Sequence, residues 1–87
     1  MIDVKKAANK AVSYVADLLG PENVLEPRIE EVELSDNGEY WLITVGFFPP
    51  MMVGSLVSRV SSDRREYKQV QIRASDGEIK AMRIRTT

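Results

Sequence analysis

Five carboxylate side chains crowd one short stretch of the chain around a predicted turn. They are Glu30, Glu31, Glu33, Asp36 and Glu39. Carboxylates at this density could bind a hard cation or serve as acid and base in catalysis. Alternating glutamates on a strand lie about 7 Å apart along the chain, because the rise is about 3.3 Å per residue. They do not converge on one ion without a second element, so we interpret the stretch as a solvated strand face and turn.

The sequence contains no histidine and no cysteine. The commonest general base, the commonest transition-metal ligand and thiolate chemistry are therefore missing. Four serines, Ser55, Ser58, Ser61 and Ser62, have no histidine partner, and nothing suggests the buried lysine that serine–lysine catalysis needs. The glycines form no phosphate-binding loop. We expect no catalytic residue, no metal site and no cofactor, and a protein that is not an enzyme.

The charges are nearly balanced overall but unevenly distributed. The net charge is −1, with 12 basic and 13 acidic residues. Eight of the basic and four of the acidic residues lie within residues 45–87. A basic sheet face could meet nucleic acid, but the basic strands lack the set of stacking aromatic side chains that is expected of a strand platform for bases. We therefore expect no nucleic-acid partner.

Residues 3–19 have the clearest helical periodicity. At 100° per residue, one apolar sector holds Val4, Ala7, Ala8, Ala11, Val12, Val15, Leu18 and Leu19. Asp3 can cap the first turn, and Gly20 followed by Pro21 ends the helix. The alanines let this helix lie close to whatever it covers.

A central strand is predicted at residues 39–48, where the tryptophan and both phenylalanines lie. A strand at about 28–35 precedes it, and Asn37-Gly38 predicts a two-residue hairpin loop. This loop pairs apolar residues on one face: Leu34 with Trp41 and Val32 with Ile43. A three-residue loop would set Trp41 against Glu33, so the apolar match favours the first register.

Two further strands are predicted at 64–74 and 78–86. If Asp76-Gly77 is a two-residue loop, Ile72 faces Ala81 and Ala74 faces Ile79. The connection at 49–63 is unusually apolar, and a loop, a short strand or a helical turn all remain open there.

These elements predict one α+β domain over residues 1–87, with the N-terminal helix packed on a four-stranded antiparallel meander. The predicted core is Val4, Ala8, Ala11, Val15, Leu18, Val32, Leu34, Trp41, Ile43, Val45, Val70 and Ile72.

The last hairpin joins an aromatic residue, an alternating strand, a turn and a further strand, from Tyr67 to Ile79. This hairpin and the order of the predicted elements together resemble those of the small PepSY-like proteins of the cystatin-like fold. The chain departs from that pattern at Ile72-Arg73, where a Val-Asp pair is expected. The resemblance implies a binding or peptidase-modulating module. Met52-Val53-Gly54 takes the place of the cystatin inhibitory loop but lacks its Gln-x-Val-x-Gly motif, so no inhibitory residue is carried over.

Two surfaces are candidates for protein contacts. A partner-binding segment is predicted from the apolar residues after the central strand: Phe48, Met51, Met52, Val53, Leu56 and Val57. The alternative is that they cap the sheet or form an extra strand. A dimer face is predicted from apolar residues on the side away from the helix: Tyr40, Leu42, Tyr67, Met82 and Ile84. The alternative is that segment 49–63 folds back over them.

The sequence thus predicts a non-catalytic binding module whose partner is another protein or a second copy. The alternative is a small-ligand binder or enzyme that uses a cavity between helix and sheet. No apolar run approaches the roughly 20 residues of a membrane helix, and a secretory signal is not evident. We expect a cytoplasmic protein without membrane contact, although a mature exported form would look the same.

Overall fold

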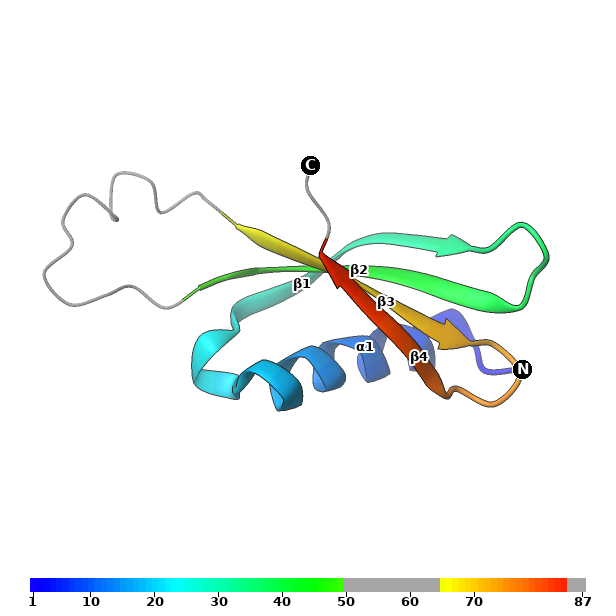
Figure 1. Ribbon diagram of the computed structural model, residues 1–87, viewed down its shortest axis with the longest axis horizontal. Helices are drawn as coiled ribbons and strands as arrows, with labels where there is room; N and C mark the ends of the chain where they lie inside the picture. Colours follow the sequence, from blue (N-terminus) through cyan, green and yellow to red (C-terminus); the bar gives the residue numbers. More distant parts are fainter. Residues whose placement is uncertain (50–64, 85–87) are drawn as a thin grey trace, which may run out of the picture.

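The computed structural model describes residues 1–49 and 65–84, which form an α+β arrangement (Figure 1). The elements in chain order are α1 (Val4–Leu19), the one-turn 3-10 helix η1 (Pro21–Asn23), β1 (Leu25–Leu34), β2 (Tyr40–Phe48), β3 (Glu66–Arg73) and β4 (Ile79–Ile84). The four strands form one antiparallel sheet in the order β1-β2-β3-β4. Helix α1 lies along one face of this sheet (Figure 1). The predicted fold class is confirmed, whereas the alternatives for 50–63 lie outside the described residues.

Helix α1 begins and ends where the sequence predicts. The Asp3 carboxylate accepts a hydrogen bond from the Lys6 N–H at 2.8 Å, and Gly20, at φ 94°, donates its N–H to the Ala16 carbonyl at 2.8 Å. The side chains that α1 buries are small: Ala7, Ala11 and Val15. Small side chains allow the helix backbone to approach the sheet closely. No helix in the described part of the chain is long and apolar enough to cross a membrane.

The core lies between α1 and the middle of the sheet. Its buried members are Ala7, Ala11, Val15, Val24, Ile43, Val45, Phe47, Val70 and Ile72. Six of the predicted core residues are confirmed: Ala11, Val15, Ile43, Val45, Val70 and Ile72. Ala8 and Trp41 are half-buried, and Trp41 packs against the core from its margin.

Four predicted core residues are wrong, since Val4, Leu18, Val32 and Leu34 are all exposed. Val4 and Leu18 lie in the first and last turns of α1, at the ends of its contact with the sheet. Val32 and Leu34 belong to β1, which is an edge strand and diverges from α1 towards its own C-terminal end (Figure 1). An apolar side chain on an edge strand has one neighbouring strand to cover it instead of two.

The β1–β2 register is the predicted one, with Leu34 opposite Trp41 and Val32 opposite Ile43. The turn type differs from the prediction. The Gly38 N–H donates to the Ser35 carbonyl at 2.8 Å, and Gly38 alone in this turn has a positive φ, of 74°. The chain therefore turns over Asp36 and Asn37, with glycine in the left-handed position after them.

The predicted β3–β4 register is wrong. Gln71, not Ile72, lies opposite Ala81, and a bulge follows before Ile72 pairs with Ile79. The turn is longer than the predicted Asp76-Gly77 loop, since the Arg73 N–H donates to the Glu78 carbonyl at 2.8 Å. This shift turns each β4 side chain that it affects to the other face of the sheet.

Candidate partner-binding edge

The predicted partner-binding segment is only partly described. Phe48 ends β2, where it lies opposite Leu25. The remaining members, Met51, Met52, Val53, Leu56 and Val57, lie outside the described residues.

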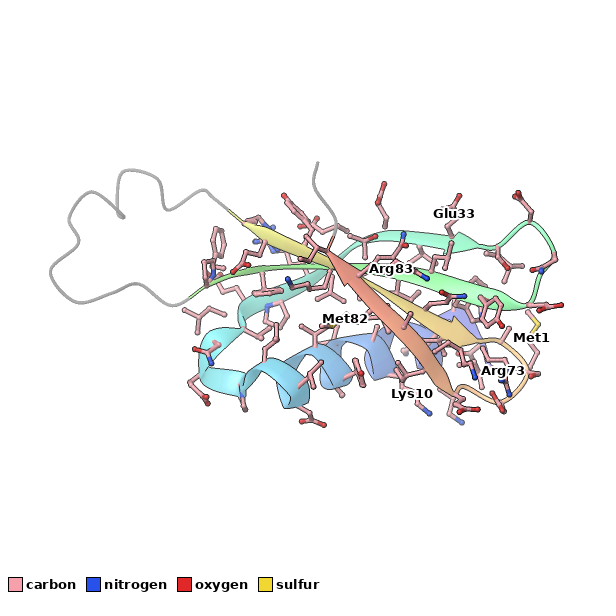
Figure 2. The ribbon with its side chains drawn as sticks, viewed as in Figure 1. Met1, Lys10, Glu33, Arg73, Met82 and Arg83 are labelled. Atoms are coloured by element: carbon pink, nitrogen blue, oxygen red, sulfur yellow. The ribbon has the colours of Figure 1, made fainter. Side chains whose placement is uncertain are left out.

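The five residues of the predicted dimer face do not share one face. Tyr40, Leu42 and Tyr67 lie on the outer face, away from α1, as predicted from the strand alternation. Met82 and Ile84 lie on the helix side, because they pair with Val70 and Lys68 in the observed register. Met82 packs against the core (Figure 2). The error follows directly from the assumed length of the β3–β4 turn.

The outer face near β1 is polar and holds a shallow depression of about 400 Å³. Its lining residues are Glu31, Val32, Glu33, Leu42, Thr44 and Gln69. Thr44 is 1% exposed, and its hydroxyl donates to Glu31 Oε1 at 3.3 Å. The carboxylates near this hairpin do not converge, and the described ranges contain no group of three or more metal-ligating side chains of the carboxylate, histidine or cysteine type.

An ion pair lies on the outer face, near the end of β2 and the start of β3. Arg65 Nη2 lies 3.0 Å from Glu30 Oε2, and the Arg65 side chain is only 12% exposed. The guanidinium carbon also lies 4.7 Å from the centre of the Phe48 ring, a cation–π distance. Gly46 lies beneath this pair, because a Cβ added there would come within 2.5 Å of Glu30 Oε2. These residues form a structural anchor that connects β1, β2 and the start of β3.

The β1 edge carries a row of exposed apolar side chains. Its helix-side row consists of Ile29, Val32 and Leu34, which are 37%, 42% and 40% exposed. On the outer side of the same strand Glu31 and Glu33 alternate with them, and Glu33 points away from α1 (Figure 2). We use "β1 edge" for these five residues.

Irregular backbone precedes the β1 edge and also interrupts it after Ile29. Register shifts occur between Leu25 and Arg28 and between Ile29 and Glu31, and Glu26 has a positive φ of 49°. Bulges and charges are common devices by which proteins prevent unwanted pairing at an edge strand. The stretch from Glu31 to Leu34 is free of such shifts, so it is the part of β1 best suited to accept another strand.

The opposite edge of the sheet is β4. Ile84 lies on its helix side and is 77% exposed. Arg83, opposite Gln69, is exposed on the outer side. The sheet therefore ends in one strand with outer carboxylates and one with an outer guanidinium, and each also has an exposed apolar side chain on the helix side.

Neither edge of the sheet was predicted as a site from the sequence. A meander whose strands pair in chain order must leave its first and last strands with one neighbour each. The predicted order of strands was therefore enough to identify both edges. Comparison with protein-family models, with curated proteins and with solved structures gives no match to this chain. The resemblance to PepSY-like proteins stays a prediction.

Proposed function

We propose that this protein is a small non-catalytic binding module that takes an extended protein segment onto the β1 edge. The observation that carries the proposal is the row of three apolar side chains, each more than a third exposed, on an edge strand. An added strand would hydrogen-bond to backbone groups of β1 on the side away from β2, and its alternate side chains would cover this row. The resemblance to PepSY-like proteins is consistent with this class of function, including modulation of a peptidase.

The packing of α1 supports the binding module over a cavity-based ligand binder or enzyme. Ala7, Ala11 and Val15 are fully buried against the sheet, which leaves their interface filled by side chains. The depression beside Glu33 lies on the outer face, and another, lined in part by Met1 and Arg73, lies near the N-terminus. Both are away from the interface between helix and sheet.

A peptide library tests the proposal. We expect ten-residue peptides with alternating apolar side chains to shift the backbone amide NMR signals of residues 29–34 in the isotope-labelled protein. Val32→Lys should abolish these shifts, since an inward-facing lysine on an edge strand blocks pairing. Leu18→Lys, at an exposed apolar position on α1, should leave them unchanged. Shifts that map to other residues, or that survive Val32→Lys, would contradict the proposal.

A further inference from the structure

We infer that the strand taken by the β1 edge is β4 of a second copy, so that copies join head to tail into one continuous sheet. The inference rests on the proposed function and names the partner for the same edge. Three properties of the two edges carry it: their direction, their helix-side apolar residues and their outer charges.

Strand direction permits this pairing with only the rotation that the twist of the sheet requires. Every neighbouring pair in the sheet is antiparallel, so β1 and β4 run in opposite directions (Figure 1). A second copy whose helix faces the same way therefore presents its β1 antiparallel to β4 of the first. Both copies then have α1 on the same side of the joined sheet.

The apolar side chains of the two edges then meet on that side. Val32 and Leu34 of one copy come beside Met82 and Ile84 of the other, since all four lie on the helix side of their strands. Ile84 is 77% exposed and Leu34 is 40% exposed, so both have apolar surface left to bury. Burial of such surface stabilises association.

The outer charges select this pairing over the symmetric ones. Glu31 and Glu33 of one copy come beside Arg83 of the other, which places opposite charges across the new strand pair. A contact between the β1 edges of two copies would instead place carboxylates against carboxylates. A contact between two β4 strands would place the Arg83 side chains of the two copies near each other. Like charges directly opposite each other destabilise a strand pair.

The width of the sheet leaves room for both helices. Four strands at about 4.8 Å spacing repeat every ~19 Å, whereas a helix with its side chains is about 10–12 Å across. The α1 helices of neighbouring copies therefore do not collide. The contact is heterologous, so it leaves a free edge at each end and produces an open chain of copies unless a ring closes.

Disulfide trapping tests the inference, because the chain has no cysteine of its own. One copy carries Val32→Cys, and a ¹⁵N-labelled copy carries Ile84→Cys; both positions are exposed and leave the charges intact. Residues that face each other across a strand pair have Cα atoms about 4.5–5.5 Å apart, which suits a disulfide. The two copies are mixed in equal amounts and oxidised, and intact mass separates the three possible dimers.

Random collision makes about half of the dimers mixed, whereas the inference predicts that mixed dimers dominate. Leu34→Cys in place of Val32→Cys samples the neighbouring register. Arg83→Glu in the Ile84→Cys copy should reduce the mixed dimer severalfold, while Lys6→Glu, the same charge change on an exposed helix residue, should not. A random or smaller proportion of mixed dimers with both β1 cysteines would overturn the inference.

The peptide titration separates this outcome from failure of the proposed function. If mixed dimers do not dominate but peptides still shift the residue 29–34 amides, the β1 edge binds strands other than β4 of a second copy. If neither is observed, both the inference and the proposed function are wrong. Predominance of the Val32→Cys homodimer would show a symmetric β1 contact and would also overturn the inference.

Discussion

The glycine at position 46 leaves the space that the Glu30–Arg65 ion pair occupies. A Cβ at this position would lie 2.5 Å from Glu30 Oε2 and 3.0 Å from Arg65 Nη2. Glu30 Cγ would also lie only 2.8 Å away, so a shift of the carboxylate alone would not relieve the contact. Glycine is required here by side-chain packing and not by a left-handed backbone.

We predict that Gly46→Ala lowers the free energy of unfolding by about 1–3 kcal/mol, the usual cost of overpacking. Gly38→Ala is the matched control, because φ is 74° there and no atom lies within 4 Å of an added Cβ. It should cost about 1–2 kcal/mol through the left-handed backbone alone. Adding Glu30→Ala should recover part of the loss for Gly46→Ala and none for Gly38→Ala in urea melts. Equal recovery in both would refute the packing explanation.

The pKa of Asp76 is lowered in the folded protein. The main cause is the Glu78 N–H, which donates to Asp76 Oδ1 at 3.0 Å, and the Arg73 guanidinium, 3.1 Å from Oδ2, adds to it. A group whose pKa falls on folding stabilises the folded state at pH values above its unfolded pKa. That contribution is lost as the pH drops through the lower, folded pKa.

Asp76→Asn should therefore destabilise the protein at neutral pH, and the difference from the unmodified chain should shrink as the pH falls below about 4. Chemical denaturation at several pH values measures the difference. Asp36→Asn, the same change in the β1–β2 turn, is the control for general charge effects. A difference for Asp76→Asn that is constant down to the acid end would show that the carboxylate charge is not involved.

At the scale of elements, Ile2 fastens the start of α1 to two parts of the sheet. Its N–H donates to the Ala74 carbonyl at 2.7 Å, and its carbonyl accepts from Trp41 Nε1 at 3.1 Å. One residue before the helix thus connects the central strand with the β3–β4 turn. Trp41 contributes through this bond as well as through its packing at the margin of the core.

We predict that Trp41→Phe loosens the first turn of α1 while the sheet persists. The lost hydrogen bond should cost about 1 kcal/mol, and the smaller ring removes some packing besides. Amide hydrogen exchange at Ile2 and Lys6 should accelerate, whereas exchange at Val70 should follow global stability only. Tyr40→Phe, on the opposite face of β2, should leave the helix start unchanged. Uniform acceleration across the chain would argue against a local tether.

The order of elements was predictable because each has its own periodicity and end signals. The β1–β2 register was also predictable, since only one alignment places apolar side chains opposite each other. The β3–β4 register was not, because Ile79, Ala81, Met82 and Ile84 do not alternate strictly, and side-chain bonds of Asp76 favour a longer turn. The core prediction failed at Val32 because it was based on hydrophobicity alone. Hydrophobicity does not tell whether a strand has a neighbour on both sides, and β1 has only one. The β1 edge was missed as a candidate site for the same reason.

At the scale of the whole molecule, the strands pair with their neighbours in sequence, whereas the helix packs against strands that lie far along the chain. Each strand pairs with the next one along the chain. Helix α1, in contrast, packs against Val70 and Ile72 of β3 as well as against β2. The first element of the chain therefore completes its contacts only when a late strand is in place.

This separation has a consequence for synthesis on the ribosome. Helix α1 leaves the exit tunnel first, yet part of its apolar side stays uncovered until β3 follows, and the bond from Ile2 to Ala74 closes later still. A single two-stranded hairpin is at best marginally stable in water, so β1 and β2 alone should not protect the nascent chain. We predict that stalled chains with β2 outside the tunnel remain sensitive to protease and that resistance appears only once the β3–β4 turn has emerged. Resistance that appears before β3 emerges would show that the helix finds cover earlier than its native contacts allow.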